Sequence, residues 1–289
     1  MLFDSADDYA KSPRHAVALF GMAGAGKTRL AGKLRRHGWF HFSVDYRIGT
    51  RHMGEFIVDN FKQQAMKLPF LSELLRSDSI YISSNITFDN LDPLSTYLGR
   101  PGNPAKGGLP LAEYQRRQEQ HRIAEVAALK DVPYFIDRAK SLYGYDNFVV
   151  DSGGSLIEVV DVDDPADPVI ATLTAHTVLV YIEGTRRSRD KLIERFKADP
   201  KPMYYRPALL AEKWAQYKRE NRLARDDDVD PGDFGAWGFE AILEDRLPRY
   251  AALARRHGYT ISASDASSVR DSDDFHALMR KAISRRKAA

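Results

Sequence analysis

The chain has 289 residues, of which 43% are hydrophobic and 29% charged, and its formal net charge at pH 7 is +3. These values are typical of a globular protein with a buried core, and so small a net charge argues against a general nucleic-acid binder. The absence of cysteine excludes disulfide bonds, thiolate chemistry and a zinc site built from cysteines.

The first residues are acidic, whereas a signal peptide begins with a basic region. Asp4, Asp7 and Asp8 lie where those basic residues would stand. No apolar run reaches the roughly 18 residues that a membrane span requires. We therefore expect a cytoplasmic protein without membrane contact, and nothing in the sequence indicates its oligomeric state.

A glycine-rich stretch follows an apolar run over residues 16–20 that predicts a buried strand. Residues 21–28 (GMAGAGKT) fit the pattern G-x-x-x-x-G-K-[ST] of phosphate-binding loops. Apolar residues then recur at helical spacing as far as Gly38, which predicts a helix that ends there. This order of strand, loop and helix suits an anion, because loop N–H groups and the helix N-terminus both point at it.

The pattern assigns a role to each position of this loop. We expect Lys27 to reach the β- and γ-phosphates of ATP and the Thr28 hydroxyl to hold Mg²⁺. The alternative is a glycine-rich turn that binds nothing. The positions expected to contact the nucleotide are Gly21, Ala23, Gly24, Ala25, Gly26, Lys27 and Thr28.

Two further apolar runs end in acidic residues. Residues 39–44 predict a strand followed by Asp45 and Arg47, and charged groups beyond a strand's carboxyl end lie where open α/β sheets bind ligands. The alternative is an exposed pair in a loop. Residues 148–151 predict a strand that ends in Asp151, a second acidic group for Mg²⁺, bound directly or through water. The turn Ser152-Gly153-Gly154-Ser155 follows and allows close approach of a ligand, or is a plain glycine turn.

Residues 54–146 are less regular and too long for one connection of an α/β core. We predict an inserted, helical, substrate-side subdomain within a single domain that spans residues 1–289. Its expected elements are a helix near residue 57, a strand or extended edge over 79–88, a loop over 93–110 and a long helix over 110–130.

The remaining residues alternate predicted strands and helices. Residues 199–207, rich in proline, cations and aromatics, form either a lid over the phosphates or a rigid surface loop. The basic tail from Arg280 to Lys287 is a solvated helix end or, alternatively, a contact for nucleic acid. We expect strands over 176–182 and 259–262, and helices around residue 192, over 209–223 and over 238–257.

Taken in order over about two-thirds of the chain, these motifs resemble the small P-loop kinases, in particular the shikimate and gluconate kinase branch. Asp45 resembles that family's carboxylate for the acceptor hydroxyl, although Ser43 replaces its first carboxylate. Gln115-Arg116-Arg117-Gln118-Glu119 resembles its F-R-x-x-E helix, which implies that Arg116 binds an acidic group of the substrate. Ser152-Gly153-Gly154 resembles its G-G-G turn with one glycine missing.

The resemblance continues through the C-terminal half. Arg195 matches an ATP-side arginine, and Lys201-Pro202-Met203 stands where the family's lid has Arg-Pro-Leu. Residues 246–254 resemble an R-x-x-x-Y-x-x-x-A helix whose arginine, here Arg246, contacts substrate. The resemblance implies an α/β, three-layer P-loop NTPase fold with a mostly parallel sheet. The long insertion and the altered acceptor motifs imply an acceptor other than shikimate. The chain is also similar to bacterial proteins labelled only as ATPases.

Residues and resemblance together predict an ATP- and Mg²⁺-dependent phosphotransferase acting on a hydroxyl of a small, anionic acceptor. Two alternatives stay open: a kinase of nucleosides, nucleotides or nucleic-acid ends, and an ATPase or nucleotide-dependent switch that acts through partners. A GTPase is disfavoured because no N-K-x-D motif occurs. The predicted catalytic residues are Lys27, Asp45, Arg116 and Arg246; Arg195 and Lys201 would bind ATP, and Thr28 and Asp151 would hold the metal.

Overall fold

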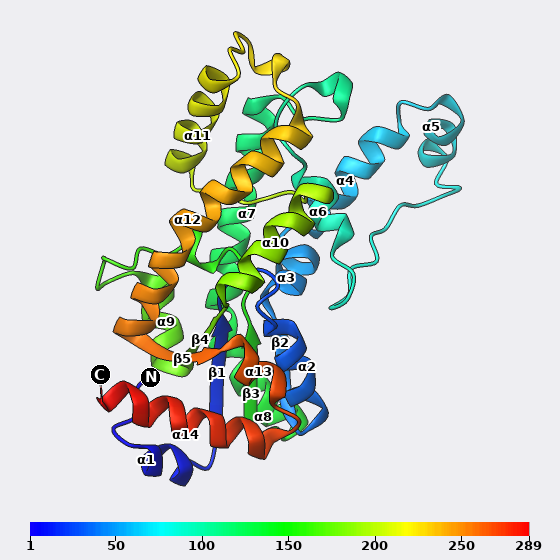
Figure 1. Ribbon diagram of the computed structural model, residues 1–289. Coiled ribbons are helices and arrows are strands. Elements are labelled where there is room, and N and C mark those ends of the chain that lie inside the picture. The colour runs from blue at the N-terminus through cyan, green and yellow to red at the C-terminus, as the bar shows by residue number, and fades with distance from the viewer. Residues whose placement is uncertain (289) are drawn as a thin grey trace. The chain divides into compact units, whose positions relative to one another are not determined.

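The computed structural model describes residues 1–288, which form two compact units (Figure 1). The chain leaves the first unit twice and returns to it each time. The second unit therefore has two segments, and its bounds differ from the single insertion over 54–146 that the sequence suggested. The first unit comprises Met1–Val44, Val126–Pro200 and Ala236–Ala289, and the second comprises Asp45–Glu125 and Lys201–Gly235.

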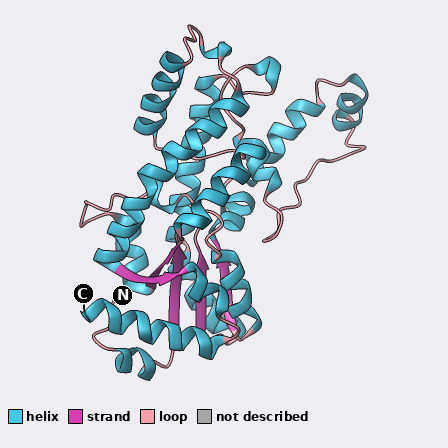
Figure 2. Cartoon of the chain, in the orientation of Figure 1, coloured by secondary structure: helices cyan, strands magenta, loops and turns pink. Residues whose placement is uncertain are grey.

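The first unit is built on a five-stranded parallel sheet (Figure 2). Its strand order is β2-β3-β1-β4-β5, so β1 is central and pairs in parallel with β3 and with β4. The prediction of an α/β protein with a parallel sheet flanked by helices is thereby confirmed. The strands are β1 His15–Phe20, β2 Trp39–Ser43, β3 Asn147–Asp151, β4 Val178–Glu183 and β5 Gly258–Ser262.

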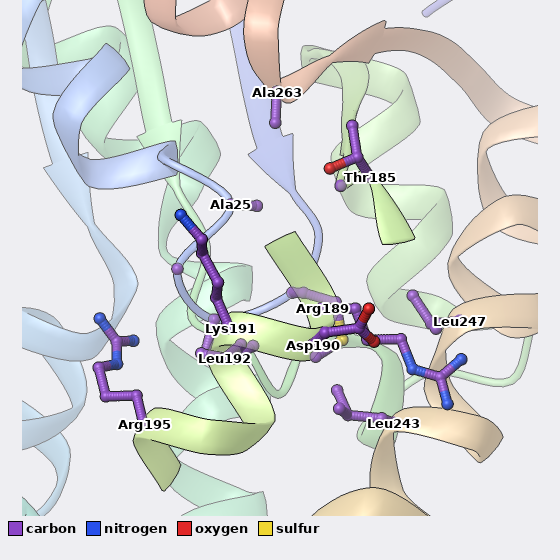
Figure 3. Close-up of a pocket in the computed structure, with 14 residues that line it drawn as sticks. Ala25, Thr185, Arg189, Asp190, Lys191, Leu192, Arg195, Leu243, Leu247 and Ala263 are labelled. Carbon is purple, nitrogen blue, oxygen red and sulfur yellow. The ribbon is translucent and has the colours of Figure 1, made fainter. Parts of the chain in front are cut away.

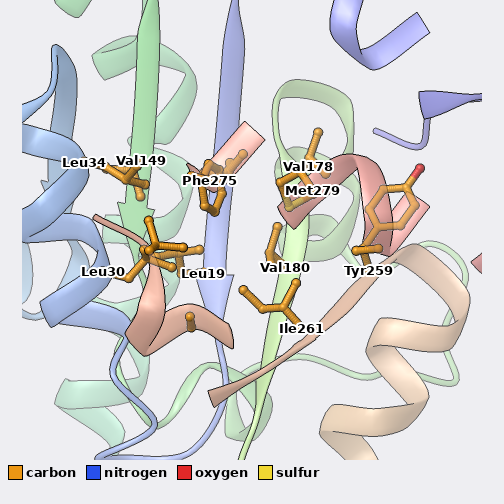
Figure 4. Packing of buried hydrophobic residues seen from close by; sticks show 14 of the residues in the cluster. Leu19, Leu30, Leu34, Val149, Val178, Val180, Tyr259, Ile261, Phe275 and Met279 are labelled. Carbon is orange, nitrogen blue, oxygen red and sulfur yellow. The ribbon is translucent and has the colours of Figure 1, made fainter. Parts of the chain in front are cut away.

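Helices cover both faces of this sheet, which explains why its strands are almost continuously apolar. On one face, α2 (Lys27–Arg36) and α14 (Ser272–Ala288) pack over the strands, together with α1 (Ala6–Lys11) and α13 (Ala263–Ser268). Figure 4 shows this core, in which Leu30 of α2 and Phe275 and Met279 of α14 lie among strand residues such as Leu19 and Val180.

The opposite face is covered by α8 (Val132–Tyr143) and α9 (Pro168–His176). The Phe42 ring of β2 lies 5.0 Å from Phe135 of α8. Tyr181 of β4 stacks between Phe20 and Tyr250, at centroid distances of 5.5 and 5.8 Å. Tyr250 belongs to α12 (Pro231–His257), one continuous helix although Pro248 lies inside it. The first unit also contains η3 (Leu156–Glu158) and α10 (Arg186–Ala198).

The second unit is mainly helical, and hydrogen bonds join its two segments. Tyr114 of α7 (Leu111–Lys130) donates to the Met203 carbonyl at 2.5 Å, and the Gln118 side chain accepts from the Tyr205 N–H at 2.9 Å. These bonds explain why residues 201–235 fold with residues 45–125. The remaining elements are α3 Val44–Arg47, η1 Ile48–His52, α4 Gly54–Ala65, α5 Pro69–Arg76, α6 Asp92–Leu98, η2 Pro104–Lys106, α11 Pro207–Glu220 and η4 Asp226–Asp228.

Two predictions for the second unit were wrong. Residues 79–88 form no strand, and Ile86 is the only one of these residues that is buried. The predicted loop over 93–110 begins as helix α6, because Pro93 is tolerated in a first helical turn and Leu94, Tyr97 and Leu98 are buried at helical spacing. Among the described residues, no helix combines the length and apolar character needed to cross a bilayer.

His15 begins the central strand and is buried among aromatic rings. Its ring lies 4.3 Å from that of Tyr9 and 4.6 Å from that of His276, and Tyr9 Oη lies 2.9 Å from His276 Nδ1. Burial lowers the pKa of His15 from 6.5 to about 4, and the charge of His276 adds to this effect. The folded protein therefore holds His15 neutral at a pH where the unfolded chain protonates it.

We expect the protein to lose stability as the pH falls from about 6.5 toward 4. In that range the unfolded state binds one more proton at His15, so the free energy of unfolding decreases with decreasing pH. Urea denaturation at pH 7 and pH 5 measures this loss, which His15→Phe should reduce. The exposed His37 supplies a control, because His37→Gln should lose as much stability as the wild type. An equal loss in all three proteins would contradict the assignment.

Candidate functional site

The first candidate site lies where the direction of the sheet's winding reverses. From β1 the chain continues to β2, which lies at the edge of the sheet beyond β3. After β3 the chain crosses to β4, which lies on the other side of β1. Open α/β sheets bind ligands beyond the carboxyl ends of the strands at such a point. Residues 21–26, here called the glycine loop, follow β1 directly at this position.

Backbone angles that few residues adopt shape the glycine loop. Gly21, Gly24 and Gly26 have φ values of +135°, +77° and +96°, in the region that side chains disfavour. The Ala25 N–H donates to the Met22 carbonyl at 3.1 Å, which closes a tight turn. Gly26 is the N-cap of α2 and has no side chain to cap it, so the positive end of this helix carries no side-chain cap.

Lys27 lies across the glycine loop. Its side chain is buried, and Nζ donates to the carbonyls of Gly21 at 2.8 Å and Met22 at 2.9 Å. A buried ammonium is costly unless it is hydrogen-bonded, and here the loop's own carbonyls bind it. The ammonium is therefore placed at the concave backbone where the sequence pattern predicts an anion.

Gly21→Ala and Gly32→Ala should change stability in opposite directions. A Cβ at Gly21 would lie 2.7 Å from the Ile182 carbonyl oxygen and the φ of +135° would be strained, so we expect a loss of about 1–3 kcal/mol or more. At Gly32, inside α2, a Cβ would meet no atom within 4 Å, and alanine should add roughly 1 kcal/mol. Urea denaturation measures both, and a loss at Gly32 with none at Gly21 would contradict the described loop geometry.

A cavity of about 770 Å³ opens beside the glycine loop (Figure 3). Residues 22–25 of the loop line it together with α10, which contributes the cations Arg189, Lys191 and Arg195 and one carboxylate, Asp190. Leu243 and Leu247 of α12 form an apolar wall. The cavity thus combines positive charge and backbone amides with an apolar surface.

Arg195, which the resemblance matched to an ATP-side arginine, lies next to the glycine loop. A Cβ built on Gly24 would lie 3.5 Å from its Nη2 and 3.4 Å from Leu192 Cδ1. The guanidinium therefore lies within van der Waals reach of the loop at Gly24. Lys27, Arg195 and the loop residues are brought together within the first unit.

Asp151 ends β3 and lies beside β1, opposite Leu19 in the strand register. Its carboxylate is buried, and Oδ2 lies 3.8 Å from His41 Nε2. Thr28 is exposed in the first turn of α2. Among the described residues, no group of three or more His, Asp or Glu could hold a metal ion. Magnesium at phosphate sites takes one or two protein groups with waters and phosphate oxygens, and a hydroxyl and a carboxylate such as those of Thr28 and Asp151 are groups of that kind.

The turn Ser152–Ser155 lies against the glycine loop. The Ser152 hydroxyl donates to the Leu19 carbonyl at 2.7 Å, and a Cβ on Gly154 would lie 3.4 Å from the Ala23 backbone nitrogen. The turn after β3 is therefore packed against the glycine loop, and its close approach to a ligand stays a prediction.

Arg246, predicted to contact substrate, is buried and bound within the first unit. Its Nε donates to Glu158 Oε1 at 2.6 Å, and its Nη1 donates to the Gly154 carbonyl at 2.9 Å. Arg249 also reaches Glu158, at 3.5 Å. The guanidinium of Arg246 thus binds the turn after β3, a role that the sequence did not suggest.

Two of the predicted acceptor residues, Asp45 and Arg116, belong to the second unit. Asp45 is half-buried in α3, directly before the π-helical turn η1, which the Met53 N–H closes on the Ile48 carbonyl at 2.8 Å. Such turns are rare and occur often at functional sites. The alternative, an exposed Asp45 in a loop, is therefore wrong.

Arg116 is exposed on α7 and forms two hydrogen bonds of 2.8 Å to Glu113. These bonds, with a further one from Arg117, lower the pKa of Glu113 to about 2. Arg117, by contrast, is buried and also donates to Asn60 at 3.0 Å. Of the two adjacent arginines, Arg116 alone presents its side chain at the surface of the second unit.

The candidate lid has an exposed and a buried part. Lys201 is exposed, whereas Tyr204 and Tyr205 are buried and the backbone on either side of Tyr204 is hydrogen-bonded to α7. The part of the segment around Tyr204 and Tyr205 is thus attached to α7, which favours the alternative of a rigid loop.

Sequence reasoning missed Glu158 and the apolar wall of Leu243 and Leu247. Glu158 lies in a short 3₁₀ turn without a motif, and its partner Arg246 is 88 residues away, so no local pattern could reveal the pair. The leucines have helical spacing, but only the fold shows that they face the cavity. No family model matches the chain, and no curated protein matches it either.

Proposed function

We propose that this protein is an ATP- and Mg²⁺-dependent phosphotransferase with a P-loop NTPase fold. The observation that carries the proposal is Lys27, whose ammonium lies across a glycine loop that joins the central parallel strand to a helix N-terminus. This arrangement suits a triphosphate, because backbone amides, a helix dipole and one fixed cation converge on one small volume.

The cavity beside the loop supports a nucleotide as the ligand. Its volume of about 770 Å³ lies in the range of small-molecule sites. Arg189, Lys191 and Arg195 would offset phosphate charge, and the wall of Leu243 and Leu247 would contact the base. The base and the phosphates would then lie at opposite sides of the same cavity.

Thr28 and Asp151 would hold Mg²⁺, which when bound offsets the charge of the phosphate oxygens. Lys27 binds the β- and γ-phosphate oxygens and holds the γ-phosphoryl group in position for attack. The acceptor hydroxyl oxygen forms a bond to the γ-phosphorus, the bond from that phosphorus to the β–γ bridging oxygen breaks, and ADP leaves. Asp45 orients the hydroxyl and takes up its proton.

The acceptor is proposed to be small and anionic, with Arg116 as its binding cation and Lys201 or Arg206 stabilising charge on the transferred group. A plain ATPase or nucleotide-dependent switch is the second candidate. One observation favours it: the guanidinium groups of Arg116 and Arg246 are both paired with carboxylates of this chain. An acceptor's acidic group would have to compete with Glu113 for Arg116.

Incubation of the protein with Mg²⁺, γ-labelled ATP and a cell extract tests these two candidates. We expect the label to move to a small molecule. Release of labelled phosphate alone would identify an ATPase and overturn the transferase. Label on nucleic-acid ends or on a nucleotide would replace the proposed acceptor class.

Asp45→Asn should bind ATP like the wild type and lose transfer by about 10²–10⁴-fold, the usual contribution of a general base. Titration with a fluorescent ATP analogue and a transfer assay measure the two effects. Asp59→Asn is the matched control, because Asp59 is an exposed carboxylate of the same unit, paired with Lys62 at 3.2 Å. Full transfer in Asp45→Asn would remove Asp45 from the proposed mechanism.

A further inference from the structure

One face of α12 carries a row of residues with distinct contacts. Phe239, Leu243, Arg246 and Tyr250 follow one another at intervals of three or four residues, so they lie along one side of the helix. Phe239 stacks on Phe196 of α10, with ring centroids 3.9 Å apart and an interplanar angle of 5°. Leu243 lines the cavity beside the glycine loop. The same face therefore supports α10 and borders the cavity.

The C-terminal part of this row binds the turn Ser152–Ser155. The Gly154 carbonyl accepts one hydrogen bond from Tyr250 Oη at 2.6 Å and another from Arg246 Nη1 at 2.9 Å. A carbonyl oxygen has two lone pairs, and both are used here. Because the peptide group is planar, two donors on this oxygen fix the plane of the peptide bond from Gly154 to Ser155.

The other end of the turn is bound to the central strand. Both the hydroxyl and the N–H of Ser152 donate to the Leu19 carbonyl, at 2.7 and 3.2 Å. Between these two attachments, Gly154 approaches Ala23 of the glycine loop, where a Cβ would lie 3.4 Å from the Ala23 nitrogen. The turn Ser152–Ser155 is thus held at its first residue by β1 and at Gly154 by α12.

We propose that Tyr250 and Arg246 are positioning residues for phosphoryl transfer. They hold the turn after Asp151 against the glycine loop, and so fix the carboxylate of Asp151 relative to the phosphates that the loop binds. This inference rests on the proposed function for the reaction, but the contacts that carry it are independent of that function. It replaces the predicted role of Arg246 as a substrate contact with a role exerted through Gly154.

Tyr250→Phe isolates this role, because it keeps the ring stacked on Tyr181 and removes only the hydroxyl that bonds to Gly154. We expect kcat to fall by about 3–10-fold, as for the loss of one hydrogen bond, and the Kd of a fluorescent ATP analogue to stay within about twofold. Tyr181→Phe is the matched control: it lies in the same stack, its hydroxyl makes no bond to the turn, and kcat should not change.

Amide hydrogen exchange over residues 152–155 provides a readout that requires no activity. Exchange should be faster in Tyr250→Phe than in both the wild type and Tyr181→Phe. Equal exchange in all three would overturn the proposal whatever the enzyme does. Faster exchange with an unchanged kcat would also overturn it, because the turn would then be held for stability alone.

The two proposals fail in different ways. If the wild type with Mg²⁺ neither binds nor turns over any nucleoside triphosphate, the proposed function fails, while exchange at the turn still reports whether Tyr250 holds it. Arg246→Lys is a second test, since lysine keeps a cation for Glu158 but loses the planar donor set that reaches Gly154. Like Tyr250→Phe, it should increase the exchange rate of the same amides and lower kcat.

Discussion

Lys27→Ala should reduce ATP turnover by at least about 10²–10³-fold, the effect of removing one preorganised group that stabilises developing charge. The loss should exceed that from a surface cation, because Nζ is buried and fixed at 2.8 and 2.9 Å from two loop carbonyls. A fixed ammonium needs no reorganisation when charge develops on the transferring group. Release of ADP at saturating ATP and Mg²⁺ measures the effect.

Two controls separate this loss from a general disturbance of the fold. Arg36→Ala removes a cation from the opposite end of the same helix, where the side chain is exposed, and should leave turnover unchanged. Circular dichroism should show that Lys27→Ala keeps the helical content of the wild type. Turnover within a few-fold of the wild type in folded Lys27→Ala would exclude the glycine loop as the site of a triphosphate.

The sequence located the glycine loop because every requirement of that loop is local. Positive φ at Gly21, Gly24 and Gly26, and a lysine that returns to the loop carbonyls, need only the few residues between β1 and α2. The strands could be predicted equally well, since a parallel sheet covered on both faces needs apolar side chains at nearly every position.

Contacts between residues far apart in the sequence could not be predicted in this way. Arg246 matched a substrate-contacting motif in the sequence, but its partners Glu158 and Gly154 come from a turn that no helical or strand periodicity marks. The second unit shows the same limit, because the bonds of Tyr114 and Gln118 to residues 203 and 205 depend on the fold and not on spacing. The sequence therefore predicted one continuous insertion over 54–146, whereas in the structure two separate segments fold together.

The pairing of Arg116 with Glu113 bears on whether an anionic acceptor can bind Arg116. Arg116 is exposed and surface ion pairs are worth about 0–1 kcal/mol, so an anionic acceptor could replace Glu113 at Arg116 at small cost while Glu113 keeps its bond to Arg117. Arg246 differs, because its partner Glu158 is fully buried and displacement would leave a carboxylate without water. Of the two arginines that the sequence suggested for an acidic acceptor, only Arg116 can exchange its partner readily.

Glu158→Ala should destabilise the protein by about 3–5 kcal/mol, the usual result of removing one partner from a buried ion pair. The Glu158 side chain is fully buried and binds Arg246 at 2.6 Å and Arg249 at 3.5 Å, so its loss leaves the buried Arg246 without its counter-charge. Urea denaturation measures the effect.

Glu119→Ala is the matched control for this change. Glu119 also pairs with an arginine, Arg122 at 2.7 Å, but both side chains are 40% exposed or more, so the loss should not exceed about 1 kcal/mol. If the two variants lost the same small amount, the buried pair would not be what holds η3 to α12. A large loss in Glu158→Ala alone would mean that the turn after β3 depends on a charge pair that water cannot replace. The same substitution should then also speed amide exchange at residues 152–155, because Arg246 would no longer be held in the orientation that reaches Gly154.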